Sequence, residues 1–315
     1  MKILCLHAWG TSAEIFEKQM SVICNLIGET HNYVYIDGPI PCGPAKGLPA
    51  ITKGPFYNWY DGLSSAKVKV AHEIVSEIIE DEGPFDGVIG FSQGASLALS
   101  ILYHHEINHP NQPPPFRFAV FFCAVLSISP DHQFNANVIS KYSRYYKSLV
   151  EGDDSNGSQE EKEDEGNSVT EFSVQGKSSS KFKVSVPNHR GMLLLPGQKK
   201  ALANDIIGLV RQLAESGVDH DDTGMKQWNT RGGEEGFPRV YHPLVNKQRI
   251  SIPTVHAIGR SDPLRRHGAL QARLCNKNLT RVIEFHGNHK VPRNVNDLQE
   301  VAFAVEWAIR MAQLG

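Results

Sequence analysis

The sequence predicts an α/β fold with a mainly parallel central sheet flanked by helices. Three observations support this fold class. Short apolar runs alternate with stretches of helical periodicity along the chain. A glycine-flanked serine joins an apolar strand to an apolar helix within residues 87–102. Hydrophobic residues make up 40% of the 315 residues, enough for a sizeable core, and we expect a single domain over residues 1–315.

The N-terminal part of the chain is expected to supply two strands and two helices. Apolar runs predict buried strands at residues 2–6 and 33–36. Helical spacing of apolar side chains predicts helices at residues 12–27 and 66–81, and Ser12 is the expected N-cap of the first. Residues 38–63 are rich in Gly and Pro and are therefore expected to form a loop.

The same alternation continues to the C-terminus. Further strands are expected at residues 87–89, 118–126, 252–258 and 280–285. Further helices are expected at residues 95–102, 198–215, 264–275 and 294–314. Strands that alternate with helices indicate parallel pairing, because each crossover returns the chain to the same edge of the sheet.

Two segments interrupt this pattern. Residues 150–187 are strongly acidic and poor in apolar side chains, so we expect a disordered insertion there. An acidic docking segment is the alternative, although runs of charge are usually only solvated. Residues 217–249 are rich in glycine and are expected to form a second long loop.

Composition excludes several classes of protein. The formal net charge is -2, with 32 Lys and Arg against 34 Asp and Glu, which is not the basic balance of a nucleic-acid-binding protein. No apolar run has the length of a signal peptide or a membrane span, so we expect a cytoplasmic protein.

The five cysteines are scattered, which argues against a disulfide framework and against a zinc site. Cys5 and Cys123 lie in apolar runs and are expected to be small core residues.

The most informative motif lies at residues 90–94, which read Gly-Phe-Ser-Gln-Gly. This is the pattern G-x-S-x-G, a sharp strand-to-helix turn that exposes a serine hydroxyl at the end of a strand. The apolar run before it and the small apolar residues after it supply the strand and the helix that the motif requires. Ser92 is therefore the candidate nucleophile, and an ordinary glycine-rich turn is the alternative interpretation.

A serine nucleophile needs a base and an acid that orients the base. In folds that carry this motif, the acid and the histidine follow the serine, each after a late strand. Asp262 follows the strand expected at 252–258, and His289 follows the strand expected at 280–285. This chemistry requires no metal or organic cofactor, and we expect none.

Other residues compete for these roles. Asp262 precedes Pro263 and could be a plain turn residue. His286 leaves the same strand as His289, but its direction is fixed by the strand pleat, so His289 is preferred. Asp37 and Asp86 both precede Ser92, and this order counts against them.

An oxyanion hole needs two backbone N–H groups that point at the developing charge. The first is expected from Gln93, directly after the nucleophile. The second is expected from the loop after the first strand, where Trp9 is the candidate donor. His7 in the same loop is expected to brace the loop rather than to act in catalysis.

Several blocks of sequence resemble the fungal family of serine hydrolases (FSH), which belongs to the α/β-hydrolases. In chain order these blocks are KILCLHAWG at 2–10, IFEKQ at 15–19, DGP at 37–39, FYNWY at 56–60, GFSQG at 90–94, GRSDP at 259–263 and HGNHKVP at 286–292. The resemblance implies an α/β-hydrolase fold and a triad of Ser92, Asp262 and His289. It also implies hydrolysis of a carboxylic ester or thioester, and in many fungal members the release of a polyketide acyl chain from a synthase carrier protein.

The chain departs from the family in two regions. The family usually has His-Gly in the first loop, where this chain has His7-Ala8, and a left-handed backbone there would strain Ala8. Between residues 150 and 245 we find no usable resemblance. This region falls where such hydrolases build a cap over the pocket, so residues 188–249 are expected to be a cap or lid.

Two clusters bear on the substrate. Phe56, Tyr57, Trp59 and Tyr60 could line an apolar acyl pocket, or could equally pack their loop onto the core. Basic residues gather beside the expected triad loops and could dock an acidic carrier protein, or could form only a solvated rim; they are Arg260, Arg265, Arg266, Lys290 and Arg293.

The sequence therefore predicts a serine hydrolase that acts on an acyl thioester or ester. A general carboxylesterase for small esters, and an enzyme that transfers or condenses the acyl group, share the same residues and stay open. A non-catalytic ligand-binding protein is the alternative from another class. It would be signalled by a missing triad residue, and none is missing.

Overall fold

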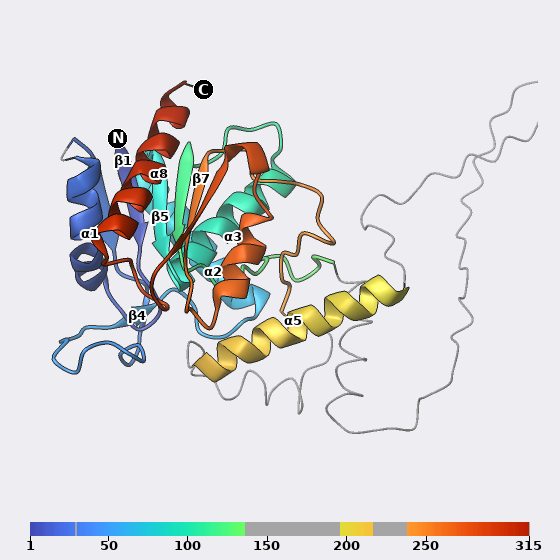
Figure 1. The fold of residues 1–315 in the computed structure, drawn as a ribbon. Coiled ribbons are helices and arrows are strands. Elements are labelled where there is room, and N and C mark those ends of the chain that lie inside the picture. The colour runs from blue at the N-terminus through green and yellow to red at the C-terminus, as the bar shows by residue number, and fades with distance from the viewer. Residues whose placement is uncertain (29, 136–195, 217–237, 315) are drawn as a thin grey trace, which may run out of the picture.

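Six parallel strands form the central sheet, in the order β2-β1-β5-β6-β7-β8 (Figure 1). The computed structural model describes residues 1–28, 30–135, 196–216 and 238–314. The strands are β1 Lys2–Leu6, β2 Asn32–Ile36, β5 Gly87–Phe91, β6 Phe118–Phe122, β7 Thr254–Gly259 and β8 Thr280–Phe285. Each neighbouring pair runs parallel, so the predicted fold class is confirmed.

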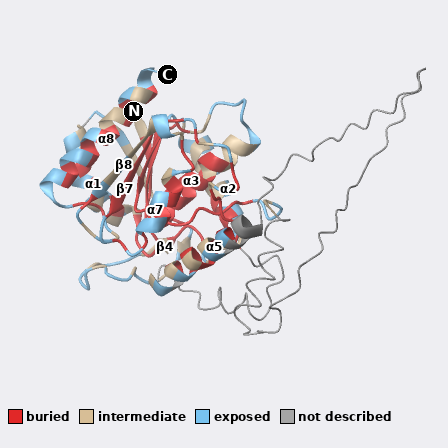
Figure 2. Ribbon diagram, turned by 45° about the vertical axis from the view of Figure 1, so that its right-hand side comes forward, coloured by how far each residue is buried: buried red, intermediate tan, exposed pale blue. Residues whose placement is uncertain are grey.

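Helices cover both faces of this sheet, because the apolar side chains of its strands alternate between the faces. Ile3 and Cys5 of β1 pack with α1 Ala13–Ile27 and α8 Val295–Leu314. Leu4 and Leu6 of the same strand pack with α2 Ser65–Glu82 and α3 Gln93–Asn108. Figure 2 shows the resulting core, with the buried residues concentrated in the sheet.

The predicted strand at 118–126 is shorter in the structure. β6 ends at Phe122, and Cys123 has a left-handed backbone, with φ of 45°. The next residues, 124–126, are buried although they form no strand. An apolar run indicates that a segment is buried, but burial alone does not distinguish a strand from a buried loop.

The loop predicted at 38–63 contains a short antiparallel hairpin. Its strands are β3 Ile40–Pro41 and β4 Tyr57–Asn58. An isolated bridge between Thr11 and Tyr57 joins this hairpin to the loop after β1. The predicted N-cap of α1 is confirmed, because the Ser12 hydroxyl accepts the Ile15 N–H at 3.3 Å.

Helix α5 Pro196–Ser216 lies across the carboxyl edge of the sheet (Figure 1). Its buried side chains pack against residues that follow β6 and β7; on α5 they are Leu202, Ile206, Leu209, Val210 and Leu213. Asp205 ties the helix to its surroundings through the His242 ring at 3.2 Å and the Arg266 guanidinium at 2.6 Å.

The expected acidic insertion at 150–187 lies outside the described residues. Of the expected cap at 188–249, only residues 196–216 and 238–249 are described, so the cap stays a prediction. Within the described part of the chain, no helix combines the length and the apolar character needed to cross a membrane.

Helix α7 Arg265–Ala272 and a single turn at Lys277–Leu279 complete the regular structure between β7 and β8. The loops that follow β1, β5, β6, β7 and β8 all leave the same edge of the sheet, because parallel strands share one direction. This shared edge is where the predicted site residues meet.

Candidate active site

Ser92 lies in a strained turn between β5 and α3. Its backbone has φ of 51° and ψ of −110°, a conformation that non-glycine residues rarely adopt. The flanking glycines permit the turn: a Cβ at Gly94 would lie 2.2 Å from the Leu6 carbonyl oxygen, and one at Gly90 would lie 2.5 Å from Ala95. The motif therefore forms the sharp strand-to-helix turn that its spacing predicts.

The His289 ring lies next to the Ser92 hydroxyl. Nε2 of His289 is 2.8 Å from Oγ of Ser92, although the two residues are 197 positions apart in the chain. The Ser92 residue is only 2% exposed, whereas the His289 side chain keeps 21% of its surface exposed. A hydroxyl in contact with an imidazole nitrogen has the geometry in which the imidazole can remove its proton.

Asp262 contacts the opposite nitrogen of this ring. Its Oδ2 lies 2.8 Å from Nδ1 of His289, and its Oδ1 accepts the Leu264 N–H at 2.7 Å. A carboxylate accepts and does not donate, so Nδ1 carries the hydrogen and Nε2 is free to accept from Ser92. Burial by itself would raise the pKa of the Asp262 carboxyl, but the bonds from His289 and Leu264 outweigh burial and lower that pKa.

A bare glycine lets the loops of Asp262 and His289 approach each other. Gly259 ends β7, and a Cβ there would lie 2.4 Å from the carbonyl oxygen of Asn288. The Ser261 N–H also donates to the Gly287 carbonyl at 2.9 Å, which joins the two loops through their backbones.

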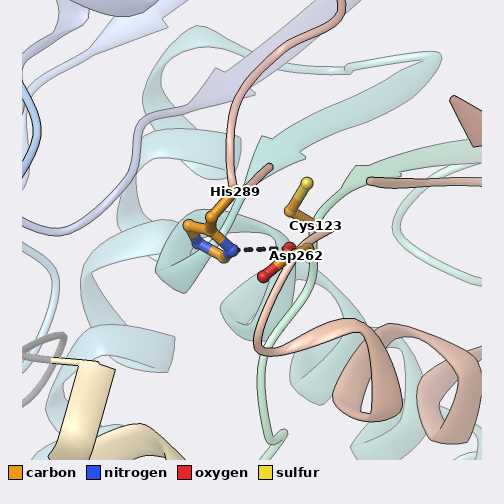
Figure 3. Close-up of side chains that lie close together, drawn as sticks. All are labelled: Cys123, Asp262 and His289. Carbon is orange, nitrogen blue, oxygen red and sulfur yellow. Dashed lines mark hydrogen bonds and ion pairs between the residues drawn. The ribbon is translucent and has the colours of Figure 1, made fainter. Parts of the chain in front are cut away.

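Cys123 lies beside the same carboxylate (Figure 3). The side-chain atoms of Cys123, Asp262 and His289 that could bind a metal lie within 4.8 Å of one another. The thiol hydrogen bond helps to lower the pKa of Asp262, whereas burial and the nearby carboxylate raise the pKa of the thiol itself. The Cys123 side chain is therefore a protonated thiol beside the Asp262 carboxylate.

This second role of Cys123 was missed by the sequence interpretation, which placed it only in the core. The residue is buried, as expected. It also follows β6, which lies between the strands that carry Ser92 and Asp262. The order of strands in the sheet brings it to the site, and no local pattern reveals that order.

The competing residues serve other parts of the fold. The His286 ring contacts Oδ1 of Asp297 at 3.1 Å and lies on the exposed side of its loop. Asp37 accepts the Ala13 N–H at 2.7 Å at the start of α1. Asp86 accepts the Lys2 N–H at 2.8 Å at the opposite edge of the sheet.

The first loop adopts its turn at Gly10 and not at Ala8. Gly10 has φ of 63°, and Ala8 is not among the described residues with a positive φ. The strain considered for Ala8 is therefore absent. His7 braces the loop as expected, because its Nε2 accepts the Gly38 N–H at 2.8 Å and its Nδ1 contacts the Ala8 carbonyl at 2.7 Å.

The predicted oxyanion donors lie on the two segments that flank Ser92. Gln93 is the first residue of α3, so its N–H belongs to the unpaired first turn of a helix. Trp9 is buried in the loop after β1. The roles of these two N–H groups stay predictions.

The four aromatic residues of the hairpin region divide into two pairs. Trp59 and Tyr60 are buried in the core on the α3 side of the sheet, whereas Phe56 and Tyr57 are partly buried. The Trp59 indole donates to the His7 carbonyl at 3.0 Å. Packing onto the core therefore accounts for Trp59 and Tyr60, and a role of all four in substrate binding stays a prediction.

The basic residues beside the site are partly neutralised. Arg266 pairs with Asp205 at 2.6 Å, and Arg265 lies 3.8 Å from Glu284. The Arg260 guanidinium donates to the Glu284 carbonyl at 3.1 Å. Lys290 and Arg293 are exposed on the His289 loop.

Comparison with known proteins identifies the family. Residues 1–154 and 185–301 match the family described as serine hydrolase (FSH1), so the family likeness extends into residues 185–245, where the sequence alone showed none. Esterase alnB of Emericella nidulans is 32% identical over 314 residues, which cover 99% of this chain and 98% of alnB. Esterase FPY3 of Fusarium mangiferae is 43% identical over 129 residues, which cover 40% of this chain and 58% of FPY3. A monoacylglycerol lipase of Paleococcus ferrophilus aligns in structure with a TM-score of 0.45 and 13% identity, over 98% of this chain and 94% of the lipase. The chain thus belongs to the FSH1 family of serine hydrolases and is a hydrolase that acts on esters.

Proposed function

We propose that Ser92, His289 and Asp262 form the catalytic triad of this hydrolase. The observation that carries the proposal is the unbroken chain of contacts from Asp262 Oδ2 to His289 Nδ1, and from His289 Nε2 to Ser92 Oγ, each at 2.8 Å. These three residues come from three separate loops at one edge of the sheet. Each contact has the length of a hydrogen bond, and the order of roles matches that of a serine nucleophile with its base and orienting acid.

The reaction follows from this geometry. Nε2 of His289 takes the proton of the Ser92 hydroxyl while Oγ forms a bond to the acyl carbon. The carbonyl oxygen becomes an oxyanion that accepts hydrogen bonds from the backbone N–H groups of Gln93 and Trp9. As the C–O or C–S bond breaks, the imidazolium returns its proton to the leaving alcohol or thiol. In the second half of the reaction, His289 takes a proton from water while the water oxygen attacks the acyl carbon. The bond to Ser92 Oγ then breaks, Oγ receives the proton from His289, and the carboxylic acid leaves.

For the substrate we infer an acyl thioester on a carrier protein, with the release of a polyketide chain as the reaction. The support is the family resemblance together with the basic residues around the loops of Asp262 and His289. Because Arg265 and Arg266 already have acidic neighbours, the docking surface is less positive than the sequence alone suggests.

Charge reversal at both Arg265 and Arg266 tests this docking surface. It should slow the release of an acyl chain from a carrier protein and leave the rate of hydrolysis of a small thioester unchanged. An equal loss of rate with both substrates would argue against docking.

Two other reactions share this site. A general carboxylesterase would use the same residues on small esters, and alnB and FPY3 are both named esterases. An acyl-enzyme resolved by an alcohol or a carbon nucleophile would transfer the acyl group instead of hydrolysing it. A purely ligand-binding role is disfavoured, because the serine, histidine and aspartate are all present and in contact.

The experiment that tests the proposal compares the wild type with Ser92→Ala on a panel of acyl thioesters and oxo-esters. The wild type should turn over members of the panel, and its acyl-enzyme should appear in the intact mass. Ser92→Ala should lose turnover with every substrate and keep the wild-type circular dichroism. A folded Ser92→Ala protein with wild-type turnover would exclude the proposed triad.

A further inference from the structure

The side chain of Gln93 links two segments that the mechanism needs to hold together. Gln93 is the first residue of α3 and is 6% exposed. Its Nε2 donates to the Tyr60 carbonyl at 2.6 Å, and its Oε1 accepts the Trp59 N–H at 2.9 Å. Both ends of the amide are therefore used, by adjacent residues of one segment. We call residues 57–60 the strap.

The strap in turn contacts the loop after β1 on both sides of Trp9. Before Trp9, the Trp59 indole N–H donates to the His7 carbonyl at 3.0 Å. After Trp9, the Gly10 N–H donates to the Tyr57 carbonyl at 3.0 Å and to Asn58 Oδ1 at 3.1 Å. The backbone on either side of the Trp9 amide is thus tied to the strap.

The far side of this loop is also fixed. Burial lowers the pKa of His7, so the ring is neutral and can donate at one nitrogen while it accepts at the other. Nδ1 donates to the Ala8 carbonyl, and Nε2 accepts the Gly38 N–H. The strap is therefore the connection between a braced loop and the helix that begins at Gln93.

We propose that the Gln93 side chain is a positioning group that sets, through the strap, the separation of the Gln93 and Trp9 backbone N–H groups. The inference rests on the proposed function, because it assigns both N–H groups to one oxyanion. Two donors on separate loops stabilise an oxyanion only when both lie about 2.7–3.1 Å from the same oxygen. Gln93 thus acts at two levels, with its backbone on the oxyanion and its side chain on the second donor.

The variant Gln93→Met tests this role, because methionine has a similar length and removes both amide hydrogen bonds. We expect kcat for a small ester to fall by about 10- to 100-fold with little change in KM, because a misplaced donor weakens the transition state more than the bound substrate. Affinity for a trifluoromethyl ketone, which forms a tetrahedral oxyanion adduct on a serine, should fall by the same factor. Trp59→Phe removes the indole hydrogen bond to His7 and shortens a buried ring, but it keeps both Gln93 amide bonds. It should lower both quantities by a smaller factor.

Gln271→Met is the matched control. Gln271 is also a fully buried glutamine, and its Nε2 donates to the Val125 carbonyl at 2.9 Å, outside the strap. This variant should have a lower melting temperature than the wild type but keep the wild-type kcat and ketone affinity.

The inference is overturned if Trp59→Phe and Gln93→Met keep the wild-type ketone affinity, or if Gln271→Met loses as much of it. Should Gln93→Met fail to fold, Trp59→Phe against Gln271→Met decides the question. Failure of the proposed function gives a different result, in which the ketone forms no adduct on Ser92 of the wild type.

Discussion

Two histidines follow β8, and their partners separate their roles. His289 lies between Ser92 and Asp262, with contacts of 2.8 Å to each. The His286 side chain is 67% exposed and contacts Asp297. Only two residues, Gly287 and Asn288, thus separate a histidine in the site from one on the surface.

His289→Gln should lower kcat by on the order of 10⁴-fold or more, because the serine then lacks its base. His286→Gln is the matched control and should keep the wild-type kcat. Steady-state kinetics on one small ester checks both. Loss of activity in His286→Gln with retention in His289→Gln would reverse the assignment.

The individual residues of the site were largely predictable, because the order of serine, acid and histidine is a property of the chain. Ser92, Asp262 and His289 come together as the motifs indicate. The roles of Cys123 and of the Gln93 side chain were not predictable, since both depend on neighbours that are distant in sequence. Burial of Trp59 likewise depends on contacts with His7 and Gln93, which no local pattern contains.

At the scale of elements, the close approach of two loops depends on Gly259 at the end of β7. A Cβ there would lie 2.4 Å from a backbone oxygen, and a backbone atom cannot move aside as a flexible side chain can. The loop that carries His289 would have to move away from the loop that carries Asp262.

Gly259→Ala should therefore lower both kcat and stability, the latter by about 1–3 kcal/mol, because the added methyl group overpacks a closed site. Gly208→Ala is the control, since Gly208 lies in α5 and a Cβ there would meet no described atom within 4 Å outside its own helix. This control should gain about 0.5–1 kcal/mol from helix propensity. Equilibrium urea unfolding and ester kinetics measure both variants, and a Gly259→Ala protein with wild-type values would contradict the steric argument.

Strands and helices were predicted well where periodicity was strong, and less well at their ends. The prediction for 118–126 extended past Phe122 because the chain stays buried beyond β6. The hairpin of β3 and β4 was missed, because strands of two residues carry no periodicity. The order of strands in the sheet could not be predicted from the sequence either, because it is set by packing and not by any local signal.

For the whole molecule, two buried histidines make stability depend on pH. His256 and His267 are almost completely buried, and burial lowers their pKa to about 3 and about 4. An unfolded histidine has a pKa near 6.5, so between that pH and the lowered value the unfolded chain binds protons that the folded chain does not. Their stabilising contribution is complete above about pH 6.5 and is lost as the pH falls toward the folded values.

The free energy of unfolding should therefore fall between pH 7.5 and pH 5.5 by roughly 1 kcal/mol for each of these histidines. His267→Leu should reduce that fall, because neither nitrogen of His267 has a hydrogen-bond partner among the described residues and leucine binds no proton. Urea unfolding at the two pH values measures the effect. A His267→Leu protein with the wild-type pH dependence would count against this account.

The central claim is that one buried serine, activated by His289 and Asp262, carries out the hydrolysis. The most direct measurement is the intact mass of the protein after reaction with a fluorophosphonate ester mimic, followed by peptide mapping. We predict one adduct per chain, located on Ser92, absent in Ser92→Ala and formed more slowly in Asp262→Asn. An adduct on another residue would contradict the account. So would an enzyme that hydrolyses esters but gains no adduct on Ser92 after exposure to the fluorophosphonate.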